Sequence, residues 1–199
     1  MSLLIPINFV SRLFFFTPVQ LYYEQKRIAN KYNWCDVDFS TYHFPRTSVY
    51  GVGLRLRNDK DYDIDLVCAR IVNLKYLPKK RDWGMSDNIR YLPWIMDDET
   101  PTRLPQILGR NGGELALEII QWSDKEVWLA SGLQEEPKNR GPIGYRAPHN
   151  SPTMELGEYY FEIEFTGQIK GLELTPHIYA GVFDIRGIGD VRIRRIKAK

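Results

Sequence analysis

Alternation of apolar and polar residues with a period of two recurs along much of this 199-residue chain, and it limits the fold more than any other feature. It is clearest in residues 156–167, LGEYYFEIEFTG, where four large apolar residues alternate with Tyr160, Glu162 and Glu164. Successive side chains of a β-strand point to opposite faces of the sheet, so this pattern predicts a strand with one buried face. No helical period is sustained after residue 32.

Similar alternation predicts further strands, separated by segments rich in Gly, Pro and Asp. In residues 48–57, Val52, Leu54 and Leu56 share one face and two arginines lie on the other. The remaining predicted strands are residues 66–76, 104–108, 114–122, 126–130, 177–187 and 190–197. Four prolines between residues 131 and 154 predict an irregular segment there. Seven or so strands from about residue 45 onward indicate an all-β, antiparallel two-sheet sandwich, with a jelly roll as the alternative.

The composition agrees with strands joined by turns. Aromatic residues make up 13% of the chain, which also holds 15 Gly and 12 Pro. A hydrophobic fraction of 43% provides a core, and 27 basic against 25 acidic residues leave a net charge of only +2. Such a balance produces no overall positive field that would attract nucleic acid, so the net charge disfavours a nucleic-acid partner.

The first 23 residues, MSLLIPINFVSRLFFFTPVQLYY, contain a single charge, Arg12. A membrane-spanning helix needs about 20 mostly apolar residues, but Pro6, Arg12 and Pro18 interrupt this stretch. We therefore divide the chain into a hydrophobic segment, 1–32, and a sandwich domain, 33–199. Residues 3–23 are expected to anchor the chain in a membrane, to lie at its interface, or to pack on the domain as a short helix. Lys26, Arg27 and Lys31 follow, and favour a domain in the cytoplasm or on the cytoplasmic face of a membrane.

Three sequence blocks, YGVGLRLRND at 50–59, VCARIVNLKY at 67–76 and LGEYYFEIEF at 156–165, carry a resemblance. With the apolar segment before them, they resemble the immunoglobulin-like β-sandwich domains of prokaryotic proteins of unassigned function. The resemblance covers residues 45–185. It implies an immunoglobulin-like fold and a non-enzymatic role, and it implies no ligand.

Four aspartates at every second position, Asp59, Asp61, Asp63 and Asp65, are similar to the start of a calcium-binding loop. The sixth position of that loop requires Gly and the twelfth a Glu, whereas this chain has Ile64 and Arg70. We therefore favour a solvated acidic turn over a looser calcium site and assign no metal.

The remaining candidates for chemistry lack the spacing that chemistry requires. His43, His149 and His177 have no ligand spacing. Cys35 and Cys68 form no CxxC motif, which leaves two free thiols or one disulfide. No nucleophile elbow, phosphate loop or dinucleotide fingerprint occurs. We therefore predict a non-enzyme without a cofactor.

Two features are candidates for binding. The first is a set of aromatic residues in or beside loops, whose rings, if exposed, can stack on sugars or fill partner pockets. Its members are Trp83, Tyr91, Trp94, Trp128 and Tyr145. The second is a basic tail, expected to form the outward face of an edge strand and to be solvated or to contact anionic lipid or nucleic acid. Its members are Arg192, Arg194, Arg195 and Lys197.

Three functional hypotheses follow. The first is a non-catalytic module that binds a protein partner through loops at 79–103 and 131–155, tethered to a membrane by residues 3–23. The second is a carbohydrate-binding sandwich that uses the loop tryptophans. The third is a structural or capsid-like protein that assembles through strand edges and the basic tail.

Overall fold

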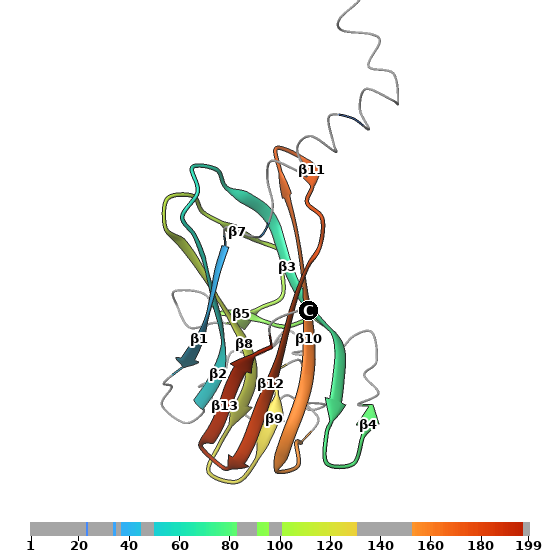
Figure 1. The fold of residues 1–199 in the computed structure, drawn as a ribbon. Helices are drawn as coiled ribbons and strands as arrows, with labels where there is room; N and C mark the ends of the chain where they lie inside the picture. The colour runs from blue at the N-terminus through green and yellow to red at the C-terminus, as the bar shows by residue number, and fades with distance from the viewer. Residues whose placement is uncertain are drawn as a thin grey trace, which may run out of the picture.

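A computed structural model describes residues 23, 34, 37–44, 50–82, 91–95, 101–130 and 153–196. Within these residues the fold is an all-β sandwich of two antiparallel sheets, as the alternation predicted. The long strands of both sheets run along the long axis of the molecule (Figure 1). β7 and β11 lie in the upper part of that view, and β4 and β9 lie in the lower part.

The first sheet has six strands, and every pairing in it is antiparallel. Its order is β1 (Val37–Phe44), β2 (Tyr50–Asn58), β8 (Gly113–Trp122), β5 (Trp94–Ile95) and β6 (Pro101–Thr102). The sixth strand, β9 (Val127–Leu129), pairs with the end of β8.

The second sheet has seven strands, all paired antiparallel. Its order is β13 (Asp190–Arg195), β12 (His177–Gly187), β10 (Gly157–Ile169), β3 (Ile64–Tyr76) and β4 (Arg81–Asp82). Two short strands lie off this path: β11 (Leu172–Glu173) pairs with β10, and β7 (Gln106–Leu108) pairs with β3.

The core lies between the sheets and is formed by the faces that alternation predicted. Val52, Leu54 and Leu56 of β2 are fully buried, and so are the apolar residues of β10 that face the core from the other sheet. Those residues of β10 are Tyr159, Phe161, Ile163 and Phe165. Tyr159 and Phe161 also stack on Phe183 of β12, with ring centroids 5.0 and 5.4 Å apart. Stacked rings add to the hydrophobic contribution of burying these large side chains.

A β-bulge changes which face of β3 is buried. Ala69 and Ile71 face the core, but the next core residues are Leu74 and Tyr76, because the pairing with β10 shifts by one residue between Asn73 and Ile71. An extra residue in one strand moves the side chains that follow it to the opposite face. The alternation of Val67, Ala69 and Ile71 with Cys68, Arg70 and Val72 therefore holds up to the bulge and does not continue through the rest of β3.

β1 lies outside the strands that the sequence predicted, since those began at about residue 45. It pairs with β2 along all eight residues and contributes Val37 and Phe39 to the core. The two-residue strands β4, β5, β6 and β11 were also not predicted, because two residues carry no period.

Gly53 allows β2 and β8 to approach closely. A Cβ atom at this position would overlap the carbonyl oxygen of Leu117 and would lie 2.9 Å from the Cα of Glu118. The register shift between Val52 and Gly53 leaves one extra residue, Ile119, in β8. This glycine is therefore required by the bulge and not by a turn.

Candidate interaction surfaces

The structure divides the five predicted aromatic binding residues into three groups. Trp94 of β5 is 1% exposed and Trp128 of β9 is 4% exposed, so both lie buried in strands instead of in open loops. Tyr91 is exposed and forms an isolated bridge with Arg70. Trp83 and Tyr145 lie outside the described residues. Within the described part of the chain, the predicted set therefore provides one open ring.

The basic tail forms β13, which is an edge strand of the seven-stranded sheet as predicted. Arg192 pairs with Asp190 at 3.2 Å, and Arg194 pairs with Glu158 of β10 at 3.0 Å. The Arg195 guanidinium lies 5.4 Å from the centroid of the Tyr179 ring. Lys197 lies outside the described residues. The two outward arginines are thus balanced by carboxylates, which reduces the field that the tail presents to an anionic partner.

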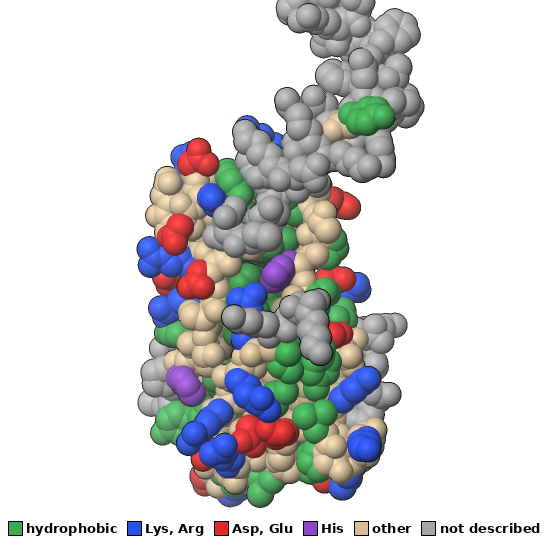
Figure 2. Space-filling model, viewed as in Figure 1, with side chains coloured by type: hydrophobic (Ala, Val, Ile, Leu, Met, Phe, Trp, Pro, Cys, Tyr) green, Lys and Arg blue, Asp and Glu red, His purple; other side chains and the backbone are tan. Residues whose placement is uncertain are grey.

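The outer face of the seven-stranded sheet carries a row of glutamates from β10. Besides Glu158, the carboxylate of Glu164 accepts a hydrogen bond from Arg70 at 2.6 Å. Glu162 accepts hydrogen bonds from Asn73 and from the Tyr160 hydroxyl. The hydrogen bond to Glu162 raises the pKa of Tyr160 to about 12, with burial and the charge of that carboxylate adding to the effect. Figure 2 shows the resulting mixture of basic and acidic side chains over the lower part of the molecule.

A buried chain of polar groups lies on the outer side of the six-stranded sheet. The Trp128 indole donates to Gln121, and the Gln121 amide donates to Glu118, each over 2.6 Å. The register pairs Gly53 with Glu118 and Gly51 with Gln121, so two glycines lie beside these polar groups on the same face. The alternation of β8 correctly placed Glu118 on the face away from the core, but it did not predict that this carboxylate is buried.

His177 is half-buried at the start of β12 and stacks on Phe39 of β1, with ring centroids 5.1 Å apart. Its Nε2 atom is buried and has no hydrogen-bond partner. Burial lowers the pKa of His177, and the charge of Arg195 lowers it further. His43 lies on β1 and is exposed, while His149 is outside the described residues. Among the described residues, no group of three or more His, Cys, Asp or Glu is placed to hold a metal ion.

The acidic turn between β2 and β3 is organised by Asn58, which is fully buried. The Asn58 amide donates to the carbonyl of Tyr62 at 2.8 Å and to that of Leu108 at 3.5 Å, and its oxygen accepts from the Lys60 backbone at 3.1 Å. Asp59 pairs with Arg57, and Asp63 accepts from the backbone of Arg110. Two of the four aspartates therefore have structural partners within the protein.

Cys68 carries a free, partly exposed thiol on β3, and burial raises its pKa. The structure thus does not contain the disulfide that the sequence left open. Cys35 itself is outside the described residues.

Exposed large apolar side chains occur at both ends of the sandwich, and none of them belongs to the binding residues that the sequence predicted. At the end formed by the β12–β13 turn they are Tyr50, Leu77, Leu156 and Ile188, called here the Ile188 end. Near the start of β3 they are Leu66, Leu104 and Ile107, called here the Leu66 patch. Exposed apolar patches in proteins frequently mark contact surfaces.

Contacts link the members of the Ile188 end in two pairs, Tyr50 with the turn that holds Ile188, and Leu77 with Leu156. Tyr50 stacks on Trp122, and a Cβ atom at Gly189 in the β12–β13 turn would lie 3.6 Å from the Trp122 indole nitrogen. The Tyr76 hydroxyl donates to the Leu156 carbonyl, and the backbone of Leu77 donates to that of Glu158. The four side chains thus come from four segments and span both sheets.

Comparison with known proteins gives no relative: no family model, no curated protein and no solved structure matches the chain. Among the described residues, no helix is long and apolar enough to cross a membrane. Of residues 3–23, the structure describes Tyr23 alone.

Proposed function

We propose that this chain is a non-catalytic interaction module that binds a protein partner and is held at a membrane by residues 3–23. The observation that carries the proposal is the Ile188 end, where four large apolar side chains from separate segments are exposed at one end of the sandwich. Protein interfaces are rich in aromatic and aliphatic anchors of this kind. The apolar composition of residues 3–23 supports the tether.

We also propose that the sandwich is immunoglobulin-like. We compare seven strands with an immunoglobulin domain, namely β1, β2, β3, β5, β8, β10 and β12, and leave out the edge strand β13 and the short strands β4, β6, β7, β9 and β11. Numbered from first to seventh in chain order, the strands of the first sheet have the order first, second, fifth, fourth. The second sheet has the order seventh, sixth, third. These are the ABED and GFC orders of immunoglobulin domains, and they favour this topology over a jelly roll.

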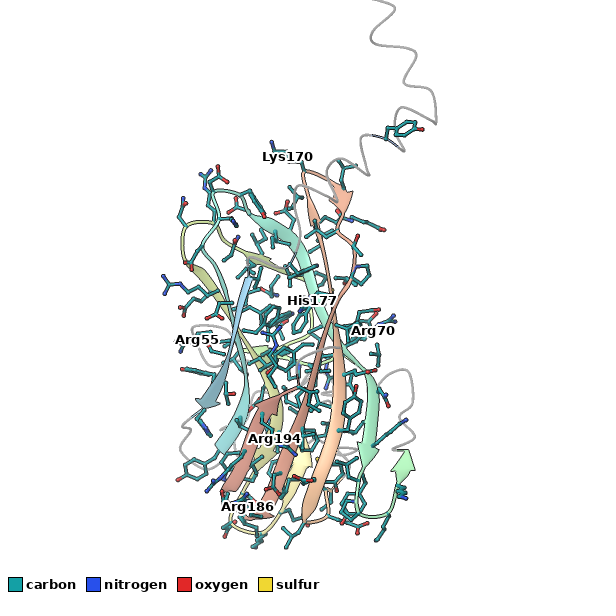
Figure 3. All side chains as sticks on the ribbon, in the orientation of Figure 1. Arg55, Arg70, Lys170, His177, Arg186 and Arg194 are labelled. Atoms are coloured by element: carbon teal, nitrogen blue, oxygen red, sulfur yellow. The ribbon has the colours of Figure 1, made fainter. Side chains whose placement is uncertain are left out.

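Partner binding can be tested by site-specific photo-crosslinking of the full chain in cells. A photoreactive residue at Ile188 is expected to give one discrete crosslinked product with another protein. The matched control carries the same photoreactive residue at position 170. Lys170 follows the last residue of β10, at the end of the sandwich opposite to the Ile188 end (Figure 3). Equal products at both positions, or none at Ile188, would contradict the partner site.

The tether is tested by comparing the full chain with a chain that begins at Asn33. We expect the full chain to float with membranes and the shorter chain to remain folded and monomeric in solution. If both chains stay in solution, the tether is wrong and residues 3–23 have another role.

A second function, assembly through strand edges, is favoured by β1. This eight-residue edge strand contains no Lys or Pro, the residues that usually protect an edge from pairing. Light scattering at high protein concentration distinguishes the two functions, since an assembly protein forms oligomers without a partner.

A further inference from the structure

The Leu66 patch is the most exposed group of large apolar side chains among the described residues. Leu66 is 50% exposed, Ile107 is 63% exposed and Leu104 is 71% exposed. β3 pairs with β7 through Ile64–Leu108 and Val67–Gln106, which leaves Leu66 in a bulge that faces Ile107. The three side chains therefore belong to adjoining segments at one end of the sandwich.

The backbone of Leu66 is strained. Its φ of 51° lies in the left-handed region, which bulky residues rarely adopt. Strained residues of this kind cluster at functional sites. Here the strain accompanies the exposure of a large aliphatic side chain.

Arg103 lies next to Leu104 in the chain and differs from the paired arginines of this protein. Its Nε atom is buried without a hydrogen-bond partner, and no ion pair to it occurs within the described part of the chain. Burial lowers its pKa. By contrast, Arg70, Arg186 and Arg194, labelled in Figure 3, each pair with a carboxylate within 3.0 Å. Arg103 as a whole is only partly buried, so the outer nitrogens of its guanidinium are the ones suited to a phosphate or carboxylate from another molecule.

The patch lies at the end where the chain enters the domain. Trp34 is buried against Phe165, and a Cβ atom at Gly167 would touch both Trp34 and Ile64. Leu66 follows Ile64 by two residues. Ten residues, 24–33, join this entry point to the apolar residues 3–23, and ten residues span at most about 35 Å. A membrane that holds residues 3–23 is therefore within reach of this end of the domain.

We propose that the Leu66 patch rests on the lipid surface, with its aliphatic side chains among the headgroups and Arg103 bound to a lipid phosphate. The inference rests on the proposed tether and adds an orientation to it, with the entry end toward the membrane and the Ile188 end away from it. The four aspartates of the acidic turn lie at the same end together with Lys60, Arg110 and Lys170, so this end carries charges of both signs. The surface recognised is therefore one that offers phosphate without a high negative charge, such as phosphatidylcholine.

The test uses the full chain on phosphatidylcholine vesicles, with Cys35 and Cys68 replaced by Ser. A nitroxide is attached at I107C or, as the control, at I188C. We expect the label at position 107 to be accessible to oxygen and protected from a water-soluble nickel chelate, as in lipid, and the label at position 188 to show the reverse. R103Q is expected to move the label at position 107 toward water. Vesicles of a galactolipid, which has no phosphate, should have the same effect.

The outcomes separate the inference from the tether. If the chain floats with vesicles while the label at position 107 is as accessible to nickel as the label at position 188, the inference is wrong and the tether stands. Spectral broadening between labels at position 107 would identify a second copy of the chain as the occupant and would also overturn the inference. A chain that does not float refutes the tether and the orientation together.

Discussion

Replacing Gly53 by Ala tests the close approach of β2 and β8. A Cβ atom at this position would lie 2.8 Å from the carbonyl carbon of Leu117 and 2.9 Å from the Cα of Glu118, whereas carbon atoms in contact are about 3.5–4.0 Å apart. The strands must therefore separate by more than half an ångström, since both contacts are with backbone. Overpacking typically costs about 1–3 kcal/mol, and we expect about 3 kcal/mol here because no side chain can rotate away.

The assay is urea unfolding, supported by thermal unfolding. For a domain of this size, a loss of about 3 kcal/mol lowers Tm by roughly 6–12 °C. Gly187→Ala is the matched control, because no atom lies within 4 Å of a Cβ at that position, and it should change the free energy of unfolding by less than about 0.5 kcal/mol. If Gly53→Ala is as stable as the control, the register between β2 and β8 is wrong.

Three further predictions concern buried polar groups. Because burial and Arg195 lower the pKa of His177, the unfolded chain binds its proton more readily. The free energy of unfolding should therefore fall as pH drops below about 6.5, and His177→Phe should flatten that dependence in urea titrations at several pH values. Asn58→Ala removes three hydrogen bonds of a fully buried side chain and should cost about 2–3 kcal/mol in urea unfolding; an unchanged midpoint would contradict its role in the turn. Trp128→Phe leaves Gln121 without its indole donor and should cost about 1–3 kcal/mol, and full stability of this variant would show that the polar chain contributes nothing.

The sequence predicted the strands whose alternation is long and regular, because the period of side chains in a strand is fixed. It located β10 and β2 with their correct buried faces, and it missed β1, which contributes Val37 and Phe39 to the core. It could not predict the bulges in β3 and β8, since an extra residue depends on the partner strand and leaves no local signal.

The candidate surfaces were harder to predict, because residue type does not determine which face a side chain occupies. Trp94 and Trp128 are as aromatic as any loop residue, yet their strands bury them. Leu66 belongs to a predicted strand, and no sequence rule places a leucine in a left-handed backbone conformation. Arg103 is one of many arginines, and only the three-dimensional structure shows that its Nε is buried without a hydrogen-bond partner among the described residues, whereas Arg194 pairs with Glu158.

The two apolar surfaces are far enough apart to act independently. β10 extends from Gly157, paired with Ile185 near the Ile188 end, to Ile169 near the entry end, and 13 residues of strand span roughly 40 Å. Leu156→Asp should therefore abolish crosslinking from the photoreactive residue at position 188 without moving the nitroxide at position 107. Leu66→Asp should move that nitroxide toward water without affecting crosslinking. The double variant should show both effects unchanged in size, because the effects of substitutions at sites this far apart are additive. If either substitution alters both readouts, one surface serves both contacts, and a module that faces membrane and partner with opposite ends is the wrong description.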